Sequence, residues 1–275
     1  MLMCVHGVFQ MKRTSTAFRI ACCLGLWLLS NAPHVFAQNA DELAKQTQNP
    51  VSSLISVPFQ GNWDVGVGAR DATATTLNIQ PVAPFSLTKD VNVILRVIMP
   101  LVSQPTDDGL RINGMSDTVT TVFFSPARTG KVIWGAGPVL LFPTATNNAL
   151  GQEQVGLGAS VVALVQPAKW TTGLLWNQIW GAGGANDRPD INQGFFQPFV
   201  NYNLGNGIAV GASIEATASW DVDEVWNSAL IFTVSKVTTL GKRPVNFVFG
   251  AGPTLASPTG TEWKMRFQAN FLFPR

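Results

Sequence analysis

The stretch from residue 262 to residue 275 constrains the fold of this chain most, because its side chains alternate between apolar and polar. The two sets are Trp263, Met265, Phe267, Ala269, Phe271 and Phe273 on one side, and Lys264, Arg266, Gln268 and Asn270 on the other. Leu272 is the single exception. Successive side chains of a strand point to opposite faces, so the stretch predicts a strand with one apolar and one polar wall. In a soluble sheet the apolar wall covers a core, whereas in a transmembrane barrel it faces lipid and the polar wall lines the lumen.

The composition narrows the choice between these two folds. Hydrophobic residues make up 46% of the chain and charged residues only 12%, against about 25% charged in typical soluble domains. Beyond the first 37 residues, no apolar run approaches the roughly 18 residues of a transmembrane helix. The chain is therefore expected to be either a β protein with a very large core or a membrane barrel.

Residues 1–37 have the pattern of a secretory signal peptide. Three basic side chains precede the apolar run Ile20–Leu29, namely Lys12, Arg13 and Arg19. Small residues then stand at the usual cleavage positions in Val35-Phe36-Ala37. We therefore predict export and removal of the segment after Ala37, with Met11 as an alternative start.

The mature chain that this cleavage would leave contains neither cysteine nor histidine. All of them fall in the removed segment: Cys4, Cys22, Cys23, His6 and His34. The usual nucleophile–histidine arrangements and zinc sites are therefore excluded, and only a pair of carboxylates could serve an acid–base reaction. We expect no enzyme activity, no cofactor and no metal site. Removing three basic residues leaves 18 − 3 = 15 basic against 16 acidic residues, so nucleic acid is not an expected partner.

Residues 38–50 are expected to form a short helix or linker, with a polar helix over Asn39–Asn49 and Asp41 as its cap. After it, segments of period two recur to the end of the chain. They predict twelve strands, at 51–60, 73–85, 91–101, 115–126, 131–142, 154–166, 170–180, 192–204, 207–219, 226–238, 243–255 and 262–273. An even number of strands of roughly spanning length is what bacterial single-chain barrels require. The predicted fold class is all-β, a single transmembrane antiparallel barrel over 51–275.

The connections between these strands alternate in length and charge. Every second one is short and mostly basic, as in Thr88-Lys89-Asp90 and Leu240-Gly241-Lys242. The others are mostly longer and acidic, as in Gly61–Ala72, Ser103–Gly114 and Gly181–Ile191. Outer-membrane barrels have short periplasmic turns and longer outer loops, so we expect the short turns and both termini on the periplasmic side.

Proline recurs inside the predicted strands and indicates a repeat. Because proline cannot donate to a strand ladder, bulges, kinks or strand ends are expected at Pro58, Pro81, Pro100, Pro138, Pro198 and Pro253. Trp134-Gly-Ala-Gly-Pro138 resembles Phe249-Gly-Ala-Gly-Pro253, and Gln80-Pro81 resembles Gln197-Pro198. Both offsets correspond to six predicted strands, so we hypothesise two six-stranded halves. Shared hairpin composition is the alternative explanation.

Several motifs together resemble a family of Gram-negative outer-membrane barrels. They are Leu43-Ala-Lys-Gln46 with Asn49-Pro-Val51, Leu54–Gln60, Trp134–Thr146, Asp187-Arg-Pro-Asp190, Gln197–Tyr202 and Phe271-Leu-Phe-Pro274. The family is called "transporter" or, misleadingly, "neuromedin U", and is similar to the barrel proteins of the meta-pathway of phenol degradation. The resemblance implies an outer-membrane barrel with a transport role, but it transfers no site residues. The Pro274-Arg275 ending departs from the aromatic ending of many such barrels.

The charged residues expected to point into the lumen are the candidate site. They are Arg96, Asp117, Glu215, Lys264 and Arg266. Opposed charges of this kind can set a transverse field that selects solutes. Alternatively, they only pair with one another across a packed interior.

Small and apolar inward positions on 131–142 and 243–255 favour passage of small, hydrophobic or aromatic molecules over a wide aqueous pore. They are Gly135, Gly137, Val139, Leu141, Val248, Gly250 and Gly252. The predicted function is passive transport, with outer-membrane lipids and lipopolysaccharide, the barrel-assembly machinery and small-molecule solutes as partners. A structural or surface-interaction barrel with a filled lumen is the first alternative, and a secreted soluble β-sandwich is the second.

Overall fold

The computed structural model describes residues 34–185, 188–221 and 225–274, all of which belong to one compact unit. The predicted signal peptide lies outside the described residues except for its last four positions, and it stays a prediction. The described chain forms one α-helix ahead of a single antiparallel sheet, and a short 3-10 helix, η1 (Asn148–Leu150), in the connection after Phe142. Its elements are α2 (His34–Thr47), β1 (Ile55–Val67), β2 (Ala72–Ile79), β3 (Val82–Ser86), β4 (Val91–Pro105), β5 (Arg111–Met115), β6 (Thr118–Pro126), β7 (Ile133–Phe142), β8 (Gln154–Val165), β9 (Trp170–Gly184), β10 (Asn192–Gly205), β11 (Ile208–Ser219), β12 (Val225–Leu240), β13 (Arg243–Ala256) and β14 (Trp263–Phe273).

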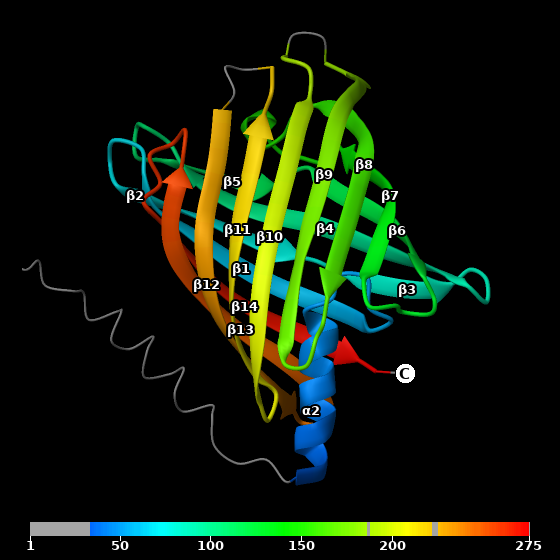
Figure 1. The fold of residues 1–275 in the computed structure, drawn as a ribbon. Helices are drawn as coiled ribbons and strands as arrows, with labels where there is room; N and C mark the ends of the chain where they lie inside the picture. The colour runs from blue at the N-terminus through cyan, green and yellow to red at the C-terminus, as the bar shows by residue number, and fades with distance from the viewer. Residues whose placement is uncertain (1–33, 186–187, 222–224, 275) are drawn as a thin grey trace, which may run out of the picture. The chain divides into compact units, whose positions relative to one another are not determined.

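The sheet closes on itself, because β1 pairs with β14 from Ile55 opposite Phe273 to Val65 opposite Trp263. Strands that follow one another in the chain also pair in antiparallel fashion, apart from β2 with β3 and β5 with β6 (Figure 1). β2 and β3 are two parts of one barrel strand, as are β5 and β6, since both parts of each pair with β4. The described residues therefore form a closed twelve-stranded antiparallel barrel, which confirms the predicted fold class.

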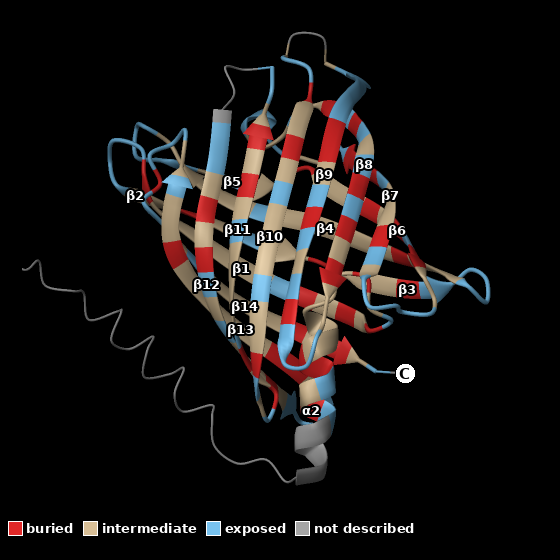
Figure 2. Ribbon diagram, viewed as in Figure 1, coloured by how far each residue is buried: buried red, intermediate tan, exposed pale blue. Residues whose placement is uncertain are grey.

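The outer face of the barrel is apolar. Large side chains exposed on it include Leu157, Trp170, Trp176, Phe196, Phe232, Trp263 and Met265. They stand on strands whose alternate positions are buried or partly buried (Figure 2). A soluble monomer does not expose apolar surface on this scale, whereas a barrel in lipid requires it. No helix in the described part of the chain is both long and apolar enough to cross a membrane.

The interruption between β2 and β3 falls at Gln80-Pro81. Hydrogen bonds continue across it, because Gln80 N donates to Pro58 O at 2.9 Å and Val97 N donates to Pro81 O at 3.1 Å. The register against β4 is the same on both sides, with Ile79 opposite Met99 and Val82 opposite Arg96. The strand end expected at Pro81 is thus confirmed, and it leaves the barrel wall closed.

The two Gly-Ala-Gly-Pro motifs have the same local geometry, six barrel strands apart. The pairing of β6 with β7 skips Pro138, and that of β12 with β13 skips Pro253. A Cβ on Gly137 would stand 1.9 Å from Val122 O, and one on Gly252 would stand 1.7 Å from Leu230 O. In both places glycine permits a close approach of two backbones beside a proline. The two halves therefore resemble each other at these motifs in structure as well as in sequence. That they arose by duplication stays a hypothesis.

The first strand and the helix differ from the prediction. β1 runs from Ile55 to Val67, so the expected loop Gly61–Ala72 is wrong and the connection is a turn at 68–71. α2 begins at His34, so Asp41 lies inside the helix and cannot be its cap. Asp41 Oδ1 instead accepts the backbone N–H of Gly207, in the β10–β11 turn, at 2.5 Å. Toward the longer loops, the strands extend beyond their predicted ends, because the pairing within each hairpin continues there.

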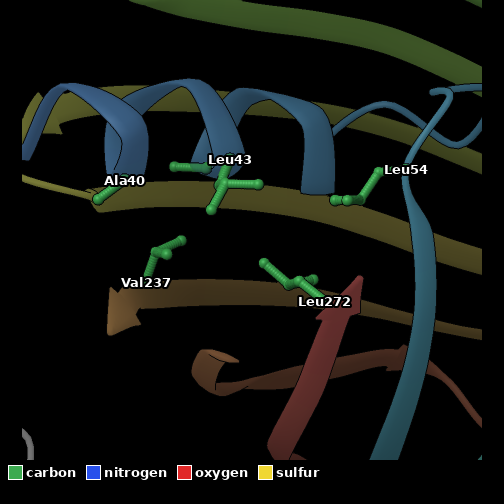
Figure 3. Packing of buried hydrophobic residues seen from close by; sticks show 6 residues of the cluster. Ala40, Leu43, Leu54, Val237 and Leu272 are labelled. Carbon is green, nitrogen blue, oxygen red and sulfur yellow. The ribbon is translucent and has the colours of Figure 1, made fainter. Parts of the chain in front are cut away.

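α2 closes the end of the barrel that carries the short turns. Ala40, Leu43 and Ala44 are buried against Val237 of β12 and Leu272 of β14, with Leu54 beside them (Figures 1 and 3). Polar contacts add to this packing, as Gln48 Nε2 donates to Asn203 Oδ1 at 2.9 Å and Gln166 Nε2 donates to Lys45 O at 3.0 Å.

The segment after α2 crosses the mouth of the barrel. Val51 is buried among inward-facing side chains of β4, β6, β8 and β9, namely Ile94, Phe123, Val162, Leu164 and Leu175. Leu54, three residues on, packs with Leu272 on the inner face of β14. The helix and the segment 48–54 therefore form a plug at this end, and we use that name for residues 39–54.

Candidate functional site: the barrel lumen

Two cavities occupy the interior of the barrel. The outer cavity, toward the longer loops, has a volume of about 400 Å³ and includes Asp64, Asn78 and Lys264 in its lining. The inner cavity, of about 260 Å³, is bounded by the plug residues Gln46 to Pro50. Polar side chains of β1, β10 and β14 line both, so the alternation read from the last strand does place its polar wall inside.

Six residues line both cavities and mark the level at which the cavities meet. They are Gln60 of β1, Gln80 between β2 and β3, Arg96 of β4, Leu175 of β9, Gln197 of β10 and Arg266 of β14. We call this set the belt. It carries three amides, two guanidinium groups and one apolar side chain, so it is rich in hydrogen-bond donors.

A charged bridge joins two strands a quarter of the circumference apart at the belt. Arg266 of β14 holds Glu215 of β11 with two hydrogen bonds, from Nη1 to Oε1 at 2.7 Å and from Nη2 to Oε2 at 2.8 Å. Asn62 Oδ1 accepts from Arg266 Nε at 2.8 Å, and Gln197 Nε2 donates to Glu215 Oε1 at 2.9 Å. A bidentate pair with neutral partners on both sides has fixed geometry. The bridge spans two intervening strands, β12 and β13.

Lys264 forms a second ion pair nearer the loop end. Its Nζ lies 2.9 Å from Asp64 Oδ1, which stands directly opposite on β1. This pair lies along the wall of the outer cavity and does not cross it. Both Lys264 and Arg266 therefore have a carboxylate partner.

Arg96 has a different environment. Its Nη2 donates to Gln80 Oε1 at 3.0 Å, and among the described residues it forms no ion pair. Arg96 stands on the third barrel strand and Glu215 on the ninth, which places them half the circumference apart. Gln80 and Gln197 also occupy corresponding places in the two halves. At matching positions beside these glutamines, one half carries the cation Arg96 and the other the anion Glu215.

Asp117 does not line either cavity. Its carboxylate accepts the backbone N–H groups of Ala145 at 3.1 Å and Gln152 at 2.6 Å. It is buried at the interruption between β5 and β6. Asp117 therefore anchors the loop 143–153, and we withdraw it as a lumen candidate.

Asn62, Asp64 and Gln197 were missed by the sequence reasoning. The predicted first strand ended at residue 60, which assigned Asn62 and Asp64 to an outer loop. A signal was present, because Gln60, Asn62 and Asp64 alternate with the apolar Phe59, Trp63 and Val65 apart from Gly61. Continuing the period-two pattern through Gly61 would have placed them beside Arg266 and Lys264.

The apolar inward positions on β7 pack with one another. Val139 and Leu141 are buried against Ile179 and Ile191, and Gly135 faces Val51 of the plug. Among these positions only Leu141 lines the outer cavity. One side of the lumen is therefore filled, and the open space lies beside the polar strands.

The closed barrel has the fold of known outer-membrane proteins. The barrel has a TM-score of 0.62 with the outer-membrane channel COG4313 from Pseudomonas putida F1, at 16% identity over 80% of this chain and 94% of that one. It has a TM-score of 0.53 with the NanC porin, at 8% identity over 80% of this chain and all of the porin. Likenesses at this identity establish the fold alone.

Sequence comparison adds little to this assignment. No family model matches the chain. A 156-residue stretch is 28% identical to 2,4-dichlorophenol 6-monooxygenase from Delftia acidovorans. It covers 55% of this chain, and the chain spans about a quarter of that enzyme's length.

Proposed function

We propose that this protein is an outer-membrane channel through which small molecules pass by diffusion. The observation that carries the proposal is the pair of polar cavities that meet at the belt, inside a barrel whose outer face is apolar. A barrel whose interior served only stability would fill its whole cross-section with side chains, as one side of this lumen does. The polar side instead keeps about 400 and 260 Å³ of space along its length.

The plug controls access at the short-turn end. It lines the inner cavity with Gln46 to Pro50 and is held by Leu43 and Val51. Solutes can then leave the lumen only past residues 48–54. We infer a channel that is closed at rest and conducts when the plug moves.

Permeability of reconstituted vesicles tests the proposal. The mature chain and a Leu43→Asp variant, which puts a carboxylate into the plug contact, are compared for uptake of a pentose and of a trisaccharide. We expect Leu43→Asp to admit the pentose at least about tenfold faster than the wild type, because an unpaired buried charge disfavours the docked helix. The trisaccharide should stay outside.

Glu42→Ala is the matched control, because Glu42 is on the exposed side of the same helix. Folding of each variant is checked by the shift in gel mobility on heating. A folded barrel that stays impermeable with Leu43→Asp and also after deletion of residues 39–49 would contradict the channel function. The alternative, a structural barrel with a filled lumen, would then stand; the apolar filling on the β7 side is the observation in its favour.

A further inference from the structure

We propose that the belt selects small organic anions that carry a carboxylate on an apolar body, with Arg96 as the group that binds the carboxylate. The inference rests on the proposed channel function and deepens it. It starts from the charge balance of the lumen. The described residues that line the two cavities include three cations, Arg96, Lys264 and Arg266, against two carboxylates, Asp64 and Glu215.

The two carboxylates are already matched. Asp64 pairs with Lys264, and Glu215 pairs with Arg266. One positive charge is in excess, and Arg96, at the level where the cavities meet, is the cation of the three that forms no ion pair among the described residues, although the charge of Glu215 still attracts it. A fixed charge in a narrow, weakly solvated passage attracts ions of the opposite sign and repels those of its own.

The donors of Arg96 are also available. A guanidinium carries five N–H groups, and among described protein groups only Gln80 accepts from this one. The planar fork of the remaining donors matches a carboxylate in two-point contact. Arg266 makes such a contact with Glu215 in the same belt, which shows the geometry that an incoming carboxylate would adopt at Arg96.

Apolar side chains border the passage beside Arg96. Leu175 belongs to the belt, Phe195 lines the outer cavity and Phe199 lines the inner one. They lie on β9 and β10, four and five barrel strands from Arg96 on β4, and belong to the apolar cluster that also contains Ile94 of β4. A solute with one carboxylate and a small apolar body can meet the guanidinium and these side chains at once, whereas an inorganic anion meets only the guanidinium.

Reversal potentials of the reconstituted channel test this inference. Measurements use the Leu43→Asp background, in which the plug is displaced, first in a gradient of potassium chloride and then with benzoate in place of chloride. We expect chloride to be more permeant than potassium, and benzoate to be at least as permeant as chloride although it is larger. Arg96→Gln should lower the anion-to-cation permeability ratio at least about threefold, because it removes the unmatched charge.

Two further variants isolate the role of Arg96. Arg96→Lys keeps the charge but loses the fork, so it should keep the chloride preference and lose the preference for benzoate. Arg128→Gln removes the same charge from an exposed turn and should change neither ratio. Absence of any conductance with the plug displaced would overturn the channel function itself. A conducting channel that prefers cations, or that keeps its anion ratio in folded Arg96→Gln, would overturn only the anion selectivity.

Discussion

Leu272 is the one apolar side chain on the polar face of the last strand, and its position explains the exception. It is only 1% exposed and packs under Leu43 of α2. Lys264, Arg266 and Gln268 of the same face line the cavities instead. The alternation therefore breaks at the point where the lumen ends and the plug begins. A single out-of-pattern residue near the end of a barrel strand can indicate a docking site for a terminal segment.

Leu272→Ala should loosen the plug while leaving the barrel folded. Truncating a buried leucine typically costs about 2–5 kcal/mol, and here the loss falls on the contact with α2. We expect faster proteolysis of residues 39–54 and a higher conductance than in the wild type. Leu157→Ala is the control, because Leu157 lies on the outer face and touches no part of the plug. Unchanged protection of the segment in Leu272→Ala would show that Leu43 is held by other contacts.

At the scale of strands, the equivalence of the two Gly-Ala-Gly-Pro motifs makes a prediction about folding. An alanine at position 137 or 252 would bring its Cβ within 2 Å of a backbone carbonyl oxygen, which no side-chain movement relieves. Gly137→Ala and Gly252→Ala should each disrupt strand pairing and lower the yield of heat-modifiable barrel sharply. Gly130→Ala, whose Cβ would meet nothing nearer than 3.8 Å, should fold normally. If only one of the two positions tolerated alanine, the halves would not be equivalent there.

The sequence predicted the number, order and direction of the strands because a lipid-facing barrel repeats one signal, alternation, in each of them. It predicted less well where glycine or proline interrupts that signal. Gly61 interrupts the alternation in the middle of β1, and the break between β5 and β6 at Ser116-Asp117 turns the Asp117 side chain away from the lumen position that an unbroken strand predicts. The contacts between strands that are not neighbours could not be predicted at all. Arg266 reaches Glu215 over two strands, and neither sequence spacing nor pattern encodes the direction in which a long side chain bends.

At the scale of the whole molecule, the plug and the C-terminal end of β14 lie at the short-turn end of the barrel. We propose that this end is periplasmic and that the longer loops are outside the cell. Single cysteines at Lys89 and at Asp107, in an exported chain expected to have none, can report this orientation. On intact cells an impermeant thiol reagent should label position 107 and leave position 89 unlabelled. Permeabilising the outer membrane should make both react, and the opposite labelling pattern would invert the orientation.

The bridge from Arg266 to Glu215 also bears on how the barrel can deform. A closed sheet flattens far more easily than it stretches, and a fixed contact between strands a quarter of the circumference apart resists flattening on that side of the barrel. The two-point contact holds β14 and β11 at a fixed separation. We therefore expect the width of the lumen between these strands to vary little. In the proposed channel, passage would therefore be controlled by movement of the plug and not by a change in the barrel wall.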